Sequence, residues 1–366
     1  MNRRQLARHC NISEIASLEN LFAAATLARR GKSRRPDVEA WWLRRESEIG
    51  RLRAELLAGA WQPGGYRTFL IYEPKRREIS AAPFADRVVH HALCRKLAPV
   101  LERRFIARSY SCQRGKGTGA ARACCRELTN SHRYVLKCDV AKFFPSIDHE
   151  ILRERLWCFV ECNGMRLLIE RILDSHRTAN WPAPLILPGE EMLEAAVRPR
   201  GLPIGNLTSQ LWGNFYLDGL DHWVTEAERH GAYVRYTDDF LLFSDHKERL
   251  WELRDGIATR LSETRLRFSL PKTRILATRE GVPFCGFRFL PSKAPRILGA
   301  TKRRFEARRH RLVNSCVAIP AASQLVRHWY RFSEEANSIG LRRAYSRGLP
   351  RTSNQSAKRH VKMAWG

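Results

Sequence analysis

Two short segments of the chain place carboxylate side chains in apolar surroundings. Asp139 lies within the apolar segment 134–140, and Asp238 and Asp239 are adjacent within the segment 234–243. A buried carboxylate is costly unless something compensates its charge, and two neighbouring carboxylates repel each other. If the fold brings these three side chains together, they therefore need a cation.

Mg²⁺ is the cation that best fits such a group, because it prefers hard oxygen ligands and binds through a few carboxylates plus substrate phosphates. Two such ions about 4 Å apart stabilise the attacking and leaving oxygens of a phosphoryl transfer. A lone Asp-Asp pair is more often only part of a turn. The segments around the carboxylates decide between these interpretations.

The apolar periodicity predicts the elements that would position the three carboxylates. Residues 1–60 are expected to be mainly helical, and residues 177–200 irregular because they are rich in proline. Further helices are expected at 38–57, 87–101, 120–130, 149–160, 205–229, 247–265 and beyond 301, and strands at 66–72, 78–80, 134–140 and, in short pieces, 266–298. A hairpin over 233–243 would place Asp238 and Asp239 at its turn, beside the strand that carries Asp139.

The charge of the chain favours a nucleic-acid partner. There are 65 Lys and Arg against 37 Asp and Glu, a formal net charge of +28. Nucleic acid is favoured because its phosphates release counterions when such a positive surface binds them. The alternative partners for this charge are an anionic membrane surface and acidic proteins. No run of about 18 apolar residues indicates a membrane span, and the ten scattered cysteines lack the spacing of a zinc site. We expect a cytoplasmic chain with buried, reduced thiols.

Three ordered motifs resemble those of reverse transcriptases. Residues 139–148 read DVAKFFPSID, residues 201–210 read GLPIGNLTSQ, and residues 236–239 read YTDD. Each motif alone is weak, but their order and spacing together resemble the family over about residues 66–298. The resemblance implies an α+β fold with the right-hand polymerase architecture. It divides the chain into an N-terminal helical extension (1–65), fingers and palm with an antiparallel sheet (66–298), and a short basic helical thumb (299–366).

The resemblance implies RNA-directed DNA synthesis with two Mg²⁺ ions. Asp139 and Asp238 would bridge both ions, Asp239 would be a weaker ligand, and the Val140 carbonyl would be a further one. Phe144 would lie under the sugar of the incoming nucleotide, where its ring excludes a 2′-hydroxyl. We favour core packing for the preceding ring, Phe143.

Other motifs resemble the parts that hold substrate and primer. Lys75 and Arg77, within PKRREI at 74–79, would bind the triphosphate, and Ile204, Gly205 and Gln210 would line the nucleotide pocket. Lys272, within SLPKT at 269–273, would lie near the pyrophosphate and donate a proton to it. Without the resemblance, Lys75, Arg77 and Lys272 would each be interpreted as an ordinary solvated side chain.

Three further groups are expected to contact nucleic acid. Arg114 and Lys116 belong to the Gly-rich segment 109–119, which lacks the ending of a P-loop. Phe284, Cys285, Gly286 and Phe287 resemble the primer grip, although a plain β-turn would have the same residues. From residue 301 onward the chain has 15 Lys and Arg against 3 Asp and Glu, and Arg303, Arg304 and Arg308 would bind the RNA–DNA duplex.

Ile204-Gly205 and Ser209-Gln210 replace the Gln-Gly and Ser-Pro of group II intron reverse transcriptases. Together with residues 82–91, which read APFADRVVHH, they resemble the reverse transcriptases of diversity-generating retroelements. Members of that bacterial and phage family copy a template RNA with errors at adenines, for mutagenic retrohoming and diversification of a target gene. They act with a small basic accessory protein, expected here as an oligomer. The alternatives are a retron-like, group II-derived or phage-defence reverse transcriptase and, in another class, a silent RNA-binding scaffold.

Overall fold

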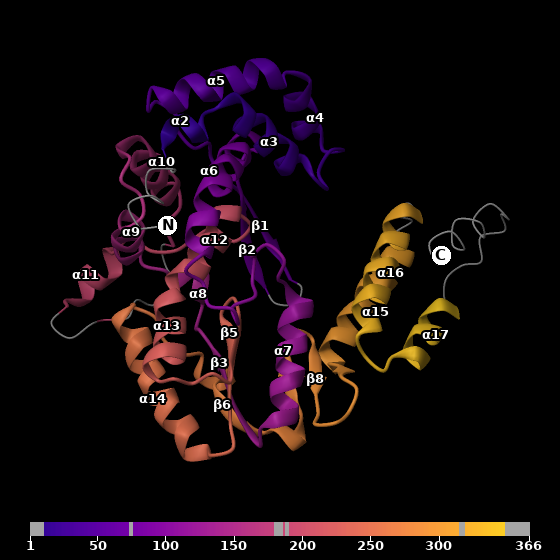
Figure 1. Cartoon of the computed structure of the whole chain (residues 1–366). Helices are drawn as coiled ribbons and strands as arrows, with labels where there is room; N and C mark the ends of the chain where they lie inside the picture. The colour runs from indigo at the N-terminus through magenta and orange to yellow at the C-terminus, as the bar shows by residue number, and fades with distance from the viewer. Residues whose placement is uncertain (1–10, 73–75, 179–185, 187–189, 315–318, 348–366) are drawn as a thin grey trace.

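The computed structural model describes residues 11–72, 76–178, 186, 190–314 and 319–347, and it confirms the expected mixed α and β architecture (Figure 1). A four-stranded antiparallel sheet has the strand order β4-β5-β3-β6. Its strands are β3 (Tyr134–Asp139), β4 (Tyr233–Tyr236), β5 (Asp239–Ser244) and β6 (Arg274–Ala277).

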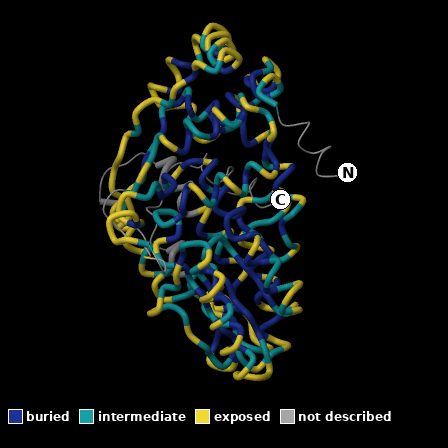
Figure 2. The backbone as a smooth tube through the Cα atoms, turned by 90° about the vertical axis from the view of Figure 1, so that its left-hand side faces the viewer, coloured by how far each residue is buried: buried dark blue, intermediate teal, exposed yellow. Residues whose placement is uncertain are grey.

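The sheet separates two hydrophobic cores, and the side chains of β3 and β5 alternate between them. Leu136 and Phe240 face the core that includes α14 (Lys247–Glu263), whereas Val135 and Phe243 face the core that includes α7 (Thr118–Ser131). Figure 2 shows that buried residues run through the middle of the molecule and that exposed residues lie mainly on its outside. Because the period of a strand is two residues, Lys137, Asp139 and Asp239 belong to the α7 side of the sheet.

The N-terminal part of the chain packs around α6 (Phe84–Glu102), whose buried residues include Val88, Leu93 and Leu97. The helices before it are α2 (Ile12–Ile15), α3 (Leu18–Arg29), α4 (Pro36–Leu43) and α5 (Arg45–Leu57). The hairpin of β1 (Arg67–Ile71) and β2 (Arg77–Ala81) connects this helical layer to α6.

The segment between β3 and β4 is helical for most of its described length. Its elements are α8 (Phe143–Ser146), α9 (His149–Trp157), α10 (Asn163–Asp174), α11 (Met192–Val197), α12 (Leu207–Tyr216), α13 (Asp218–His222) and the π-helical turn η1 (Trp223–Ala227). In Figure 1 the helices α9, α10, α13 and α14 lie on one side of the β3–β5 sheet, and α7 lies on the other.

The C-terminal part combines a small sheet with three basic helices. After the 3-10 turns η2 (Leu270–Lys272) and η3 (Thr278–Glu280), the strands β7 (Val282–Phe284), β8 (Phe287–Phe289) and β9 (Arg296–Ile297) form an antiparallel sheet. The helices α15 (Gly299–Asn314), α16 (Ile319–Glu334) and α17 (Ile339–Arg347) follow. This agrees with the short strands and the helical end that were expected.

Three expectations about individual elements were wrong. The helix expected over 38–57 is two helices, because a bend at Arg44 lets both Trp41 and Leu52 reach the core. The helix expected over 205–229 is interrupted at Leu217, so that α12 is followed by the separate elements α13 and η1. Residues 177–200 are not wholly irregular, because Glu191 and Glu194 form a capping box that begins α11.

The remaining expectations concern thiols and membranes. The eight described cysteines are free, and Cys94, Cys124, Cys125 and Cys138 are buried as expected. Over the described ranges, no helix has both the length and the apolar composition needed to cross a bilayer. The domain boundaries at residues 65 and 298 stay predictions.

Candidate active site

The fold brings the three predicted carboxylates to one end of the central sheet. Asp139, the last residue of β3, pairs directly with Asp239, the first residue of β5. The amide of Val140 donates to the carbonyl of Asp238 at 3.3 Å. Residues about a hundred positions apart in the chain are therefore neighbours, as the hairpin prediction required.

The hairpin turn has a strained backbone that fixes where Asp238 points. Thr237, which precedes it, has φ +59°, a left-handed conformation that β-branched residues rarely adopt. Its hydroxyl donates to Ser111 Oγ at 2.7 Å, and its carbonyl accepts from Arg235 Nη1 at 3.0 Å. Side chains on both sides of the turn thus hold it in this conformation.

Two lysines contact the carboxylates. Lys272 Nζ donates to Asp139 Oδ1, and Lys137 Nζ donates to Asp239 Oδ1 at 2.6 Å. The amide of Ser269 donates to the Asp139 carbonyl at 2.7 Å, which places the 3-10 turn that carries Lys272 beside the end of β3. Lys272 was expected near the pyrophosphate, and in the structure its ammonium contacts Asp139.

Lys137 is a site residue that the sequence analysis missed. It is two residues before Asp139, so in a strand its side chain shares the face of the carboxylate. Its ammonium also donates to the Pro283 carbonyl at 3.1 Å. The period of β3 was the signal that could have found it.

The electrostatics of the site favour a cation. Burial raises the pKa of Asp238 to about 6, and the nearby charge of Asp139 contributes to the same rise. Burial also raises the pKa of Asp239, while Lys137 acts in the opposite direction. A divalent cation would remove the repulsion that raises the pKa of Asp238.

The carboxylates fit Mg²⁺ by their chemistry but are not arranged as a preformed metal cage. In the part of the chain that the structure describes, no group of three or more His, Cys, Asp or Glu side chains is arranged to hold a metal. The ammonium groups of Lys137 and Lys272 instead lie on Asp239 and Asp139. Hard carboxylate oxygens whose charge is only partly compensated are suitable ligands for Mg²⁺. The ligand role of Val140 stays a prediction.

A fully buried ion pair supports the hairpin from behind. The side chains of Arg235 and Asp221 are both 0% exposed, with 2.5 Å between Nη2 and Oδ2. Tyr233 donates its hydroxyl to Asp221 at 2.7 Å, and Asn214 Oδ1 accepts from Arg235 at 3.2 Å. Burial lowers the pKa of Arg235, but the charge of Asp221, its hydrogen bond and the nearby Tyr233 and Asp218 together outweigh burial and raise that pKa.

The segment 108–116 pairs with β4 and leads to the site. The Tyr110 amide donates to the Arg235 carbonyl at 3.0 Å, and Asn214 donates to the Ser111 carbonyl at 2.6 Å. The Lys116 ammonium donates to the carbonyls of Ile106 and Ser109 at 3.1 and 2.7 Å. The structure therefore gives Lys116 a role in holding its own loop, and its contact with nucleic acid stays a prediction. Arg114 is exposed.

The residues predicted to form the nucleotide pocket belong to β2, α8, α12 and the turn before α12. The Ser80 amide donates to the Ile204 carbonyl at 3.3 Å, and a Cβ on Gly205 would lie 3.3 Å from Ile79. Cys112 Sγ lies 3.5 Å from Gln210 Oε1. On β2, Arg77 is exposed, and Lys75 lies outside the described residues. The structure thus brings Ile204 and Gly205 to the strand that begins with Arg77.

Phe143 and Phe144 differ in burial as expected. Phe143 is buried in the core, whereas Phe144 is half-buried. Both belong to the helical turn α8, which follows Lys142 in a left-handed conformation with φ +46°. A Cβ on Gly213 would lie 3.1 Å from both rings, so α12 packs closely against them.

The predicted primer grip is a tight hairpin that contacts the C-terminal helices. Cys285 and Gly286 both have positive φ values, as a two-residue turn between paired strands requires. The rings of Phe284 and Phe287 are buried, so only the turn can meet a ligand. Phe287 packs against Phe332 of α16 with 4.6 Å between ring centroids.

The basic helix α15 exposes two of the three arginines that were predicted to bind the RNA–DNA duplex. Arg303 and Arg308 are exposed, and Arg304 donates to Thr301 Oγ1 at 3.0 Å. A second contact holds α16 in place, because Arg122 of α7 forms a two-pronged ion pair with Glu335. The structure therefore joins the helical end to the palm through α7, while the duplex-binding role of the arginines stays a prediction.

A comparison with protein families identifies the family of the chain. Residues 73–289, more than half of the chain, match the protein family described as “Reverse transcriptase (RNA-dependent DNA polymerase)”. That match agrees with the right-hand polymerase architecture expected from the motifs. A comparison with curated proteins gives no match.

Several solved structures resemble the chain at low identity. Apo telomerase from Candida tropicalis has 13% identity and a TM-score of 0.44, over 62% of this chain and 47% of that one. Telomerase from Candida albicans with a TWJ fragment of telomeric RNA has 13% identity and a TM-score of 0.42, over 80% and 60%. A Cas6-RT-Cas1–Cas2 complex has 21% identity and a TM-score of 0.37, over 68% and 25%. The chain thus spans 60% or less of the length of these three chains.

Proposed function

The chain belongs to the reverse transcriptase (RNA-dependent DNA polymerase) family, and we propose that it copies a template RNA into cDNA with Asp139, Asp238 and Asp239 as its catalytic carboxylates. The observation that carries this proposal is the direct pairing of Asp139 with Asp239 at the end of the sheet, with Asp238 at the adjoining turn. Three acidic groups from distant parts of the chain are concentrated there.

The carboxylates would hold two Mg²⁺ ions. When bound, such ions supply a Lewis acid for the primer 3′-hydroxyl and neutralise charge on the leaving pyrophosphate. Asp139 and Asp238 would be the main ligands of the ions, and Asp239, partly neutralised by Lys137, would be a weaker one. Lys272 would move from Asp139 to the leaving group and donate a proton to it.

Other residues would bind and orient the deoxynucleotide. Arg77 is exposed on β2, where it can reach phosphate oxygens. The half-buried Phe144 would lie under the sugar, and Ile204 with Gly205 would face the base and sugar from the opposite side. These roles follow from the family resemblance, and the closeness of β2, α8 and α12 supports them.

Primer extension on an RNA template with Mg²⁺ and dNTPs tests the catalytic proposal. We expect Asp238→Asn and Asp139→Asn to lose at least about a thousandfold in rate, because each removes a charged metal ligand. Asp245→Asn, at an exposed carboxylate beyond β5, is the matched control and should retain activity. If the wild-type chain makes no product, or if Asp238→Asn extends primers normally, the chain is an RNA-binding scaffold and the proposal fails.

We further propose that the chain belongs to a diversity-generating retroelement of bacterial or phage origin. In that setting it would act in the cytoplasm with a small basic accessory protein, and its cDNA would carry errors at template adenines. Ile204-Gly205 and Ser209-Gln210 support this subtype. The Ile204 backbone is held on β2, which supports a fixed position for its side chain at the predicted pocket.

The Ile204 side chain offers a physical reason for errors. An isoleucine cannot donate the hydrogen bonds that a glutamine at this position would make to the base or sugar. We expect Ile204→Gln to lower misincorporation opposite adenine several-fold, while errors opposite the other bases change little. Sequencing of cDNA from both proteins measures this, with Ile204→Leu as the control for shape. An unchanged adenine error rate would leave a retron-like, group II-derived or phage-defence enzyme as the better assignment.

A further inference from the structure

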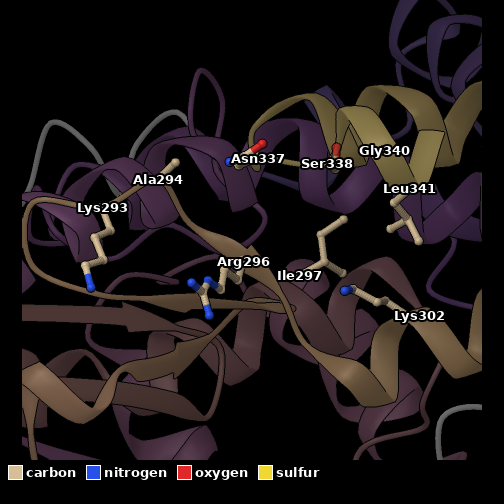
Figure 3. A pocket seen from close by; sticks show the side chains of 9 residues that line it. All are labelled: Lys293, Ala294, Arg296, Ile297, Lys302, Asn337, Ser338, Gly340 and Leu341. Atoms are coloured by element: carbon tan, nitrogen blue, oxygen red, sulfur yellow. The ribbon is translucent and has the colours of Figure 1, made fainter. Parts of the chain in front are cut away.

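A pocket of about 540 Å³ lies between the β8–β9 loop, the start of α15 and the corner that joins α16 to α17. Figure 3 shows its two sides. The β9 side is lined by Lys293, Ala294, Arg296, Ile297 and Lys302, and the helical side by Asn337, Ser338, Gly340 and Leu341. None of these residues belongs to the site described above.

The pocket is lined by cations and by no anion. Lys293, Arg296 and Lys302 line it, whereas no Asp, Glu or aromatic residue is among its lining residues. Lys293 and Arg296 are exposed and Lys302 is half-buried. Within the described part of the chain, no ion pair joins any of the three to a carboxylate. Three cations that line one pocket without a counter-charge favour an anionic ligand.

The helical side of the pocket adds a second positive feature. Helix α17, nine residues long, begins at Ile339, and its first turn is closed by the Arg342 amide, which donates to the Ser338 carbonyl at 2.8 Å. The first amides of a helix have no acceptor within the helix, and the helix dipole is positive at this end. Gly340, in this first turn, lines the pocket and has open space where a Cβ would be.

The walls of the pocket are held in place by hydrogen bonds. The Asn337 amide donates to the Pro295 carbonyl at 3.3 Å, which joins the two sides. The buried Ser338 donates its hydroxyl to the Ser333 carbonyl at 2.6 Å. Ile297 is buried in the core behind the pocket. The pocket is therefore formed before any ligand binds, which lowers the cost of binding.

We propose that this pocket binds phosphate groups of the template RNA outside the polymerase cleft. The cations and the helix N-terminus together suit phosphate oxygens. The absence of an aromatic ring from the lining argues against a nucleotide whose base would stack there. In Figure 1, α17 lies on the side of α15 and α16 away from β3 and β5, so the RNA bound at the pocket is not the segment being copied. The identification of the ligand as RNA rests on the proposed function, whereas the inference that the pocket binds an anion is independent of it.

Gly340→Glu is the sharpest test, because it adds a carboxylate to the pocket without a steric clash. We expect it to bind a fluorescein-labelled single-stranded RNA about tenfold more weakly at low salt than the wild-type chain does. Gly340→Gln has the same length without the charge and should bind nearly normally. The probe is RNA in EDTA, measured by fluorescence anisotropy. Equal weakening by both variants would show a steric effect and overturn the proposal.

A triple variant tests the cations themselves. Lys293→Gln, Arg296→Gln and Lys302→Gln together should lower the dependence of log affinity on log salt by about 2, because about three phosphate contacts to a single strand are lost. The matched control removes the same charge at exposed sites elsewhere, with Arg53→Gln, Arg126→Gln and Lys247→Gln. If both triple variants weaken binding equally, only net charge matters and the proposal is wrong.

The source of the phosphate is distinguished by competition. We expect excess unlabelled RNA to displace the probe, and inorganic phosphate or dNTPs at millimolar concentration to leave it bound. Displacement by those small anions in the wild-type chain, but not in the triple variant, would show a site for free phosphate and overturn the RNA assignment. Extension of a short primer–template should stay unchanged in Gly340→Glu. A chain that binds RNA at the pocket but extends no primer would refute the proposed polymerase function alone.

Discussion

Lys137 donates a hydrogen bond to Asp239 across the two central strands of the sheet, with 2.6 Å between Nζ and Oδ1. The same ammonium donates to the carbonyl of Pro283 at 3.1 Å, so one side chain joins a proposed catalytic carboxylate to the β7–β8 hairpin. The Lys137 side chain is only 14% exposed, so water screens the contact weakly. Without a metal ion, Lys137 supplies the positive charge that Asp239 needs.

The first prediction concerns Lys137→Met, which keeps the length of the side chain and removes its charge. We expect the metal-free protein to lose about 1–3 kcal/mol of unfolding free energy, because Asp239 is left without its partner. We also expect Mg²⁺ to bind about tenfold more tightly at neutral pH, because the site gains one net negative charge and loses a competing cation. Urea unfolding in EDTA and calorimetric titration with Mg²⁺ measure the two effects. Lys137→Arg, which keeps the charge, should change both far less.

The second prediction is a pH dependence that comes from Asp238. Its pKa of about 6 means that its carboxyl is largely protonated below that pH and cannot act as a metal ligand. We expect the rate of primer extension at low Mg²⁺ to rise as pH increases through about 6. Because a bound cation favours the ionised carboxylate, high Mg²⁺ should move the midpoint to lower pH. A midpoint that does not respond to Mg²⁺ would contradict the assignment.

The third prediction concerns stability: as pH rises, the contribution of Asp238 to the stability of the metal-free chain falls, whereas its contribution to activity rises. The pKa of Asp238 is higher in the fold than its ordinary value of 3.8, so its favourable contribution is complete below that value and is lost as pH rises through about 6. Asp238→Asn should therefore stabilise the metal-free chain at about pH 8 by about 1–2 kcal/mol, after allowance for partial exposure. The gain should shrink at about pH 5. Thermal unfolding in EDTA at both pH values measures the difference, and an equal gain at both would show that ionisation of Asp238 is not its cause.

The site could be predicted from the sequence where strand periodicity decided the geometry. Asp139 ends an apolar strand and Asp239 begins another, so an antiparallel pairing of the two strands brings them opposite each other. The same reasoning would have placed Lys137 beside them. Lys137 was missed because a lysine in a strand is usually interpreted as a solvated side chain. Its hydrogen bond to the Pro283 carbonyl depends on the tertiary structure, which the sequence does not show.

Other features could not be predicted because they depend on contacts between distant segments. The pairing of Tyr110 with Arg235 joins two segments more than a hundred residues apart, and nothing near Lys116 indicates that its ammonium would bind carbonyls of its own loop. The break at Leu217 has a similar origin. The helices that follow it carry the buried Asp218 and Asp221, whose partners are distant arginines.

The fourth prediction concerns the ion pair behind the hairpin. Arg235→Leu leaves the fully buried Asp221 without its charge partner, and it also removes the donor to the Thr237 carbonyl. We expect a loss of about 3–5 kcal/mol of unfolding free energy. Urea unfolding measures it, and the double variant Arg235→Leu with Asp221→Leu should recover much of the stability, because no buried charge remains.

Recovery of stability need not restore activity in that double variant. The Thr237 carbonyl would still lack its donor, so the turn before Asp238 would lose a constraint on its left-handed conformation. We expect primer extension by the double variant to stay at least tenfold below the wild type, about 1.4 kcal/mol in activation free energy. Full activity in a stable double variant would show that Arg235 has only a structural role.

The fifth prediction uses the close packing of Gly213 on the two phenylalanines of α8. A Cβ at this position would lie 3.1 Å from the rings of Phe143 and Phe144, so Gly213→Ala must displace at least one of them. Because Phe143 is held by the core, we expect the half-buried Phe144 to move. If its ring lies under the sugar, KM for dNTPs should rise several-fold and the preference for dNTPs over rNTPs should change.

The matched control is Gly50→Ala in α5, where a Cβ meets nothing within 4 Å and the backbone is helical. That substitution should stabilise the chain by about 0.5–1 kcal/mol through helix propensity alone and leave both kinetic quantities unchanged. Steady-state incorporation of dNTPs and rNTPs by the wild type and both variants gives the comparison. If Gly213→Ala lowers stability but leaves KM and sugar preference as in the wild type, the ring of Phe144 does not meet the nucleotide. In that case, sugar selection depends on another side chain of the pocket.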